Sequence, residues 1–164
     1  MTLLVHLDLG YEFDVKAKAR EVFDVLSDVP TSASFFPNVE HLVDLGGGAY
    51  RWEMAKIGIA TLSLQTVYAS RYVANRARGT VVWEPVKGEG NAEVSGDWRI
   101  NPQKNGTHIE LRIQGDMTLP LPALMKLVVS PLVQKEFAQM VEQYIANLTQ
   151  RFGGVDLPPI PVPI

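Results

Sequence analysis

The chain has 164 residues, 46% of them hydrophobic and 20% charged, which is the size and balance of one globular domain with its own core. Its formal net charge of −3 gives no reason to expect nucleic acid as a partner. It contains no cysteine, which excludes disulfides, thiolate catalysis and cysteine-ligated zinc and is compatible with the cytoplasmic location that we expect.

The first elements are one strand and two short helices. Residues 3–15 alternate apolar and polar side chains, which predicts a long strand with one face toward solvent. This segment carries no basic leader, so we predict no signal peptide, and no apolar run is long enough to span a bilayer. Apolar residues at helical spacing predict a helix over 19–26, and a shorter one follows Thr31 and ends at Pro37.

Alternation with a period of two returns at residue 39 and continues, with interruptions, to residue 117. It predicts strands over 39–45, 49–54, 61–74, 78–86, 92–100 and 107–117. The glycine run 46–48 and the pair Asn105-Gly106 are typical of hairpin turns. We therefore expect six strands that follow one another directly.

The last element is a long amphipathic helix. Ser130 is a suitable N-cap, Pro131 fits the first helical position and Gly153 is placed to end the helix. Residues 119–129 predict a separate, shorter helical piece before it. The proline-rich tail 153–164 is either extended or disordered. One stripe of the long helix is apolar, and it consists of Val133, Phe137, Met140, Val141, Tyr144, Ile145, Leu148 and Phe152.

This order of elements has no β-α-β alternation, which makes a parallel sheet an unsuitable solution. An antiparallel sheet curled around the final helix buries the apolar face of every strand against the apolar stripe of the helix. The fold class that follows is α+β.

Three segments of the chain resemble the START / Bet v 1-like (SRPBCC) superfamily, which includes polyketide cyclases, lipid-transfer proteins and coenzyme-Q-binding proteins. They are AKAREVFDVLSDVPTSASFFPNVEHLVDLG, VSGDWRINPQKNGTHIELRI and LVQKEFAQMVEQYIANLTQRF. The resemblance implies a helix-grip fold in the order β-α-α-β6-α, with a seven-stranded antiparallel sheet around the C-terminal helix. It covers residues 3–152, so we predict a single domain over 1–152 and a separate tail over 153–164.

The resemblance also implies a hydrophobic cavity between sheet and helix, which aromatic and methionine side chains suit. The alternative is that the same side chains fill the core and leave no cavity. The candidate ligand-binding residues are Tyr50, Trp52, Met54, Leu64, Tyr68, Trp83, Trp98, Phe137, Met140 and Tyr144.

The sequence has no pattern typical of catalysis or of metal binding. It contains no GxSxG motif, and His6, His41 and His108 lack the spacing of metal ligands. We therefore assign no catalytic residue, no metal and no cofactor. His41 alone falls on the inward set of its strand, where it either serves a ligand or lies half exposed at the strand start.

Two further segments stay open. Arg71, Arg76 and Arg78 surround the bend after residues 61–74, either as an anion-binding surface or as a solvated edge. The apolar segment 119–129 is either a mobile element that admits a ligand or touches a membrane, or ordinary packing.

The function that we expect is binding or transport of a small hydrophobic ligand: a lipid, a quinone or an aromatic polyketide-like compound. One alternative is a cyclase or dehydratase that acts in the same cavity, with His41, Tyr50, Tyr68 and Tyr144 as the proton-transferring groups. Another is a protein-interaction module that uses the tail and the arginine bend. We expect no stable membrane insertion, and a homodimer is left open.

Overall fold

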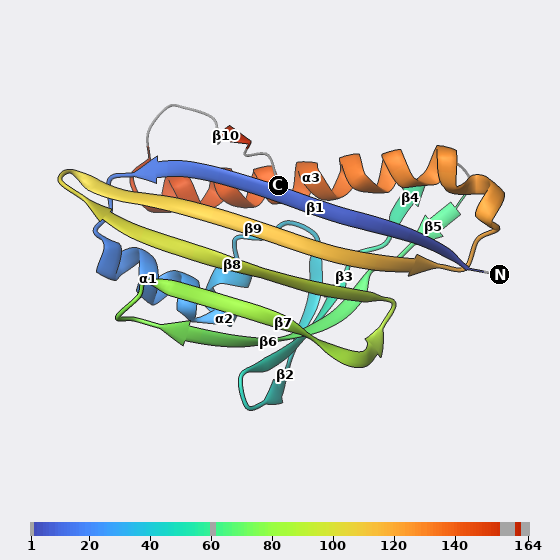
Figure 1. Cartoon of the computed structure of the whole chain (residues 1–164), viewed down its shortest axis with the longest axis horizontal. Helices are drawn as coiled ribbons and strands as arrows, with labels where there is room; N and C mark the ends of the chain where they lie inside the picture. Colours follow the sequence, from blue (N-terminus) through green and yellow to red (C-terminus); the bar gives the residue numbers. More distant parts are fainter. Residues whose placement is uncertain (1, 60–61, 155–159, 162–164) are drawn as a thin grey trace.

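The computed structural model of the chain describes residues 2–59, 62–154 and 160–161 (Figure 1). Its elements in chain order are β1 (Leu3–Val15), α1 (Ala19–Ser27), α2 (Val29–Ala33), β2 (Val39–Gly46), β3 (Ala49–Met54), β4 (Ile57–Ile59), β5 (Leu62–Leu64), β6 (Val67–Asn75), β7 (Thr80–Gly90), β8 (Ala92–Gln103), β9 (Gly106–Leu119), a 3-10 turn η1 (Ala123–Met125), α3 (Lys126–Arg151) and β10 (Ile160–Pro161).

The main sheet has the strand order β10-β1-β9-β8-β7-β6-β3-β2, and every neighbouring pair is antiparallel. Without the two-residue β10 it is the expected seven-stranded sheet, so the α+β helix-grip prediction is confirmed. In Figure 1, α3 runs along the sheet, and α1 and α2 lie near the end of the sheet where α3 finishes.

The core lies between the sheet and α3, as expected from the apolar face of each strand and the apolar stripe of the last helix. Every member of the predicted apolar stripe of the last helix, from Val133 to Phe152, is buried. The inward side chains of β1 and β9 pack against it, among them Val5, Ile109 and Leu111. Gly153 has a φ of +68°, the left-handed conformation that ends a helix and that glycine adopts without strain.

The last helix begins earlier than predicted. It starts at Lys126 and continues through Pro131, so Ser130 does not cap it, and its buried Oγ has no hydrogen-bond partner among the described atoms. Proline removes only the hydrogen bond to the carbonyl of Leu127, which lies on the exposed side of the helix within reach of water. Val129 and Val133 are both buried, so packing on either side of Pro131 maintains one helix.

The predicted strand over 61–74 is two strands. β5 leaves the main sheet and pairs with β4 in a small separate hairpin, and only β6 returns to the sheet. The chain changes direction at Gln65 and Thr66, where the Gln65 side chain donates to the Met54 carbonyl and the Met54 amide donates to the Thr66 carbonyl. Apolar and polar residues continue to alternate across this turn, so the alternation did not show that the strand is interrupted here.

Part of the tail is ordered against the sheet. Ile160 and Pro161 form β10, which pairs antiparallel with Tyr11 and Glu12 at the free edge of β1. The extended conformation, one of the two alternatives for the tail, therefore holds at these two residues. Its other predicted positions, 155–159 and 162–164, lie outside the described residues.

Candidate functional site

An apolar pocket lies between the middle of the sheet, α3 and the two short helices. Strands β3, β6, β7, β8 and β9 form its floor, and α1, α2 and the turn after α2 form one wall. The lining residues are Leu26, Val29, Ser32, Phe36, Trp52, Tyr68, Tyr72, Trp83, Val94, Trp98, Leu111, Ile113, Phe137 and Tyr144. Eight of these fourteen are aromatic.

The aromatic rings of the pocket pack closely on one another. Trp52 stacks on Tyr68 with ring centroids 5.8 Å apart and planes 11° apart, and Trp98 meets Tyr144 edge to face at 5.8 Å. The volume of the cavity that a water-sized molecule can occupy is about 40 Å³. The larger volume of about 500 Å³ also counts the gaps between atoms and the space open to solvent. The first of these volumes is well below the ~150 Å³ of an apolar cavity that admits benzene.

Polar atoms in the pocket fall into two groups. Some are satisfied within the protein, since the hydroxyls of Ser32 and Tyr144 share a hydrogen bond and Trp52 Nε1 donates to the Tyr72 hydroxyl at 2.9 Å. Others, the Tyr68 hydroxyl and the indole nitrogens of Trp83 and Trp98, make no hydrogen bond with another described residue. All three of these groups are hydrogen-bond donors, so the pocket offers unused donors to an acceptor.

Burial keeps the phenols of the pocket protonated. Desolvation is the largest cause that raises the pKa of Tyr68, Tyr72 and Tyr144 above the ordinary value of 10.0. Near neutral pH these side chains are neutral hydrogen-bonding groups, and none of them is a base.

Six of the ten predicted ligand-binding residues line the pocket: Trp52, Tyr68, Trp83, Trp98, Phe137 and Tyr144. The other four do not. Met54, Leu64 and Met140 are buried elsewhere in the core, and the half-buried Tyr50 meets the outer edge of Tyr72 with ring centroids 6.1 Å apart.

Sequence reasoning missed the residues that close the pocket from the helical side. Leu26 lies on the apolar stripe of α1, and this position indicates that its side chain is buried. The short α2 has no such pattern, so nothing in the sequence indicated that Ser32 faces inward. α2 also starts at Val29, earlier than predicted, because Pro30 suits a first helical turn. Tyr72 could have been predicted to face the pocket, because it lies four residues after Tyr68 on β6 and therefore on the same face of the strand.

The inward prediction for His41 is wrong. The register of β2 against β3 shifts between Val39 and His41, so Glu40 is an extra residue, as in a β-bulge. Beyond the bulge Leu42 lies opposite the buried Trp52, while His41 is exposed and lies 3.5 Å from Glu53.

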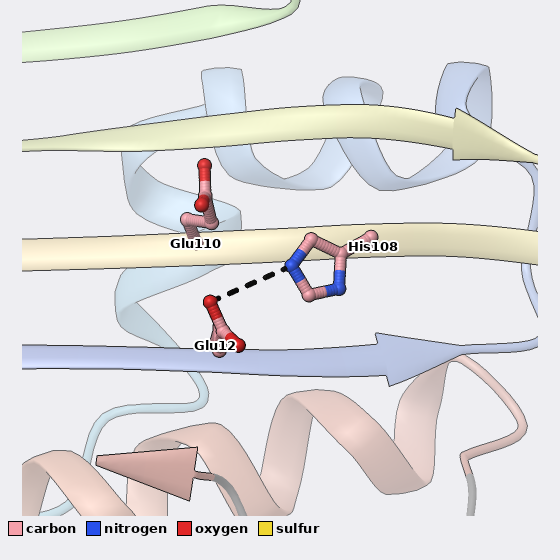
Figure 2. Close-up of side chains that lie close together, drawn as sticks. All are labelled: Glu12, His108 and Glu110. Atoms are coloured by element: carbon pink, nitrogen blue, oxygen red, sulfur yellow. Dashed lines mark ion pairs between the residues drawn. The ribbon is translucent and has the colours of Figure 1, made fainter. Parts of the chain in front are cut away.

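Figure 2 shows a second cluster, on the outer face of β1 and β9, where Glu12, His108 and Glu110 each bring one ligand-type atom within 4.8 Å of the others. His108 Nδ1 lies 2.6 Å from Asp14 and its Nε2 lies 3.8 Å from Glu12. Arg99 is the cross-strand neighbour of Glu110, and its Nε lies 3.6 Å from Asp97 Oδ1. We read the cluster as a surface charge network.

The arginine bend is largely engaged within the protein. Arg71 donates to the Gly47 carbonyl at 2.7 Å. Arg76 pairs with Asp24 at 2.6 Å, and its guanidinium lies 4.5 Å from the centre of the Phe23 ring. Two of the three arginines therefore hold neighbouring segments together.

Solved structures with the same fold are numerous. A START superfamily protein from Mycobacterium smegmatis has a TM-score of 0.64 at 16% identity, over 88% of this chain and 96% of that one. The Zhui aromatase/cyclase from Streptomyces sp. R1128 has a TM-score of 0.57 at 18% identity, over 93% and 99%. Norcoclaurine synthase from Thalictrum flavum, in complex with dopamine and hydroxybenzaldehyde, has a TM-score of 0.56 at 14% identity, over 92% and 88%.

These identities support a shared fold. No curated protein sequence matches the chain significantly. One family description, "Polyketide cyclase / dehydrase and lipid transport", matches residues 7–153, which is most of the chain and includes every residue that lines the pocket. The chain therefore belongs to the polyketide cyclase / dehydrase and lipid transport family.

Proposed function

We propose that the protein binds or carries a small hydrophobic molecule in the pocket between the sheet and α3. The observation that carries the proposal is the combination of an aromatic lining with three unused hydrogen-bond donors, on Tyr68, Trp83 and Trp98. These donors have no hydrogen-bond partner among the described residues, so each is available to an acceptor atom of a bound molecule.

The lining favours a flat ligand with at least one acceptor oxygen, such as a quinone or an aromatic ketone. Aromatic walls pack well on flat rings, and the donors match a carbonyl oxygen. Among proteins of similar fold, norcoclaurine synthase has been solved with two aromatic molecules, which agrees with this ligand class.

Such a ligand needs more room than the pocket has when it is closed. About 40 Å³ of free space requires side chains to move before a ring can enter. The wall formed by α2 and Phe36 is the part that we expect to move, since α2 has only five residues. We therefore expect binding to be accompanied by a shift of this wall.

The cyclase or dehydratase alternative has less support from the chain's own residues. Of its four candidate groups, His41 and Tyr50 lie outside the pocket lining, and Tyr68 and Tyr144 remain. Burial raises the pKa of both phenols, so they can donate a hydrogen bond but not abstract a proton near neutral pH. A cytoplasmic location stays a prediction, and enzymatic activity and a homodimer stay alternatives.

Intrinsic fluorescence tests the binding proposal directly, because all three tryptophans of the chain line the pocket. Menadione, 2-naphthaldehyde and oleic acid, titrated separately, represent quinones, aromatic carbonyl compounds and lipids. We expect saturable quenching by at least one of the first two. Native mass spectrometry of gently purified protein adds an unbiased search for a ligand that stays bound.

A matched pair of variants locates the site. Val94→Phe fills the pocket from β8, whereas Val82→Phe places the same ring on an exposed position of β7. We expect V94F to lose quenching and V82F to keep it, with thermal unfolding confirming that both variants fold. Equal binding by V94F and wild type, or no binding by any of the three compounds together with no co-purifying mass, would reject the proposal.

A further inference from the structure

The first turns of α3 and the preceding η1 carry an exposed apolar ridge. Its members are Leu124, Leu127, Val128 and Leu132, and their side chains are 93%, 89%, 64% and 43% exposed. Positions three, four and eight apart share one side of a helix, so these side chains form a continuous stripe. The opposite side carries the buried Val129 and Val133, which anchor the helix to the core.

The ridge differs from the other exposed apolar side chains of the described residues. Leu45 lies alone on β2, and Val73 and Val82 form one cross-strand pair on β6 and β7. Exposed apolar residues in ones and twos are ordinary on a protein surface. Leu4 shares its surroundings with the acidic residues Glu93 and Asp116. Only the ridge combines several large apolar side chains on one helical face.

The segment that carries the ridge contains only positive charges. Between Asp116 and Glu136 the chain contains no acidic residue, and its only charged side chains there are Lys126 and Lys135. Both lysines are exposed. The N-terminal end of a helix also carries a partial positive charge, which has the same sign as the two lysines.

We propose that this ridge docks the protein reversibly on an anionic lipid membrane. Helix α3 would lie along the surface, with the leucines inserted among the acyl chains and the lysines among the headgroups, as amphipathic helices do. No helix among the described residues is long and apolar enough to cross a membrane, so the contact stays at the interface.

The composition of the ridge favours lipid over a protein partner. It consists of aliphatic side chains only, whereas the residues that carry most protein interfaces are tryptophan, tyrosine and arginine, with leucine under-represented. Docking is also independent of the proposed ligand binding. None of the four ridge residues lines the pocket. Phe137, the first pocket residue on α3, follows Leu132 by about 7.5 Å along the helix axis.

Vesicle co-sedimentation of the full chain tests the inference. Vesicles of phosphatidylcholine alone are compared with vesicles that also contain phosphatidylglycerol. We expect binding to the anionic vesicles that falls as salt is added, and binding at least ~10-fold weaker for the double variant Leu124→Ser, Leu127→Ser. The variant Lys126→Gln, Lys135→Gln is expected to lose the preference for the anionic vesicles.

Two valines provide a matched control. Val128 in the ridge and Val73 on β6 are both 64% exposed, so Val128→Ser and Val73→Ser remove the same apolar area from water. We expect V128S to weaken vesicle binding and V73S to leave it unchanged. Circular dichroism should show wild-type helix content for all of these variants, because none of the altered side chains is buried.

Three results would overturn the inference. The first two are a wild-type protein that fails to sediment with anionic vesicles and a double leucine variant that sediments as well as wild type. The third is a wild-type dimer that the double leucine variant converts to a monomer without any vesicle binding, which would assign the ridge to a second copy of the chain. The pocket-filling V94F is expected to bind vesicles normally, so failure of the ligand proposal and failure of this one are distinguishable.

Discussion

The hydroxyl groups of Ser32 and Tyr144 share a buried hydrogen bond although 112 residues separate them in the sequence. This bond joins α2 to the middle of α3 across the pocket. It also uses the only polar side-chain atom that α2 contributes to the lining. The contact therefore connects the stability of the wall with the shape of the site.

Removing either partner should destabilise the protein. We expect Ser32→Ala and Tyr144→Phe each to lower the free energy of unfolding by about 1–3 kcal/mol, because the remaining hydroxyl stays buried without a partner. The double variant should cost less than the sum of the two. Urea unfolding of the four proteins measures this coupling, and strictly additive costs would show that the bond contributes nothing.

The Tyr68 hydroxyl should contribute to ligand affinity. We expect Tyr68→Phe to weaken binding of a quinone about fivefold, the value of one neutral hydrogen bond, with little change in stability since no bond to a described residue is lost. Tyr50→Phe is the control, because Tyr50 lies outside the lining and should not affect binding. Tryptophan quenching measures both, and equal affinity of Y68F and wild type would move the acceptor to Trp83 or Trp98.

The protein should lose stability at alkaline pH. Desolvation raises the pKa of all five tyrosines above 10.0, so above about pH 10 the unfolded chain loses protons that the folded chain retains. The stabilisation is complete below this pH and decreases as the pH rises. Urea unfolding at increasing pH, followed together with tyrosinate absorbance, should show ionisation coinciding with unfolding; ionisation of most tyrosines in the folded protein would contradict this.

Two leucines of α3 should behave oppositely. Leu148 is 0% exposed and Leu127 is 89% exposed, so the same substitution with the same helix propensity tests burial alone. We expect Leu148→Ala to lower the free energy of unfolding by about 2–5 kcal/mol and Leu127→Ala to change it by no more than about 0.5 kcal/mol. A large cost for L127A in chemical denaturation would mean that the ridge is packed in solution and is not free to dock.

The pocket was partly predictable from the sequence. Alternation along a strand predicted the inward side chains of Trp52 and Trp98, and the apolar stripe of the last helix predicted that of Tyr144. Both patterns indicate the direction in which a side chain points. Met54 and Leu64 have the same inward parity but pack elsewhere. The alternation along a strand shows which face of the sheet a side chain lies on. It does not show where along that face the pocket lies.

The sequence by itself determined the main strands and helices, their order and the stripe of α3 that is buried, since each of these follows from local periodicity and from glycine and proline at the turns. Only the tertiary structure decided what depends on partners distant in the chain. The bulge at Glu40 turned His41 outward, packing of Val129 and Val133 carried α3 through Pro131, and Ser32 reached Tyr144. Each of these outcomes is set by contacts across the fold, where burial and hydrogen bonding outweigh local preference.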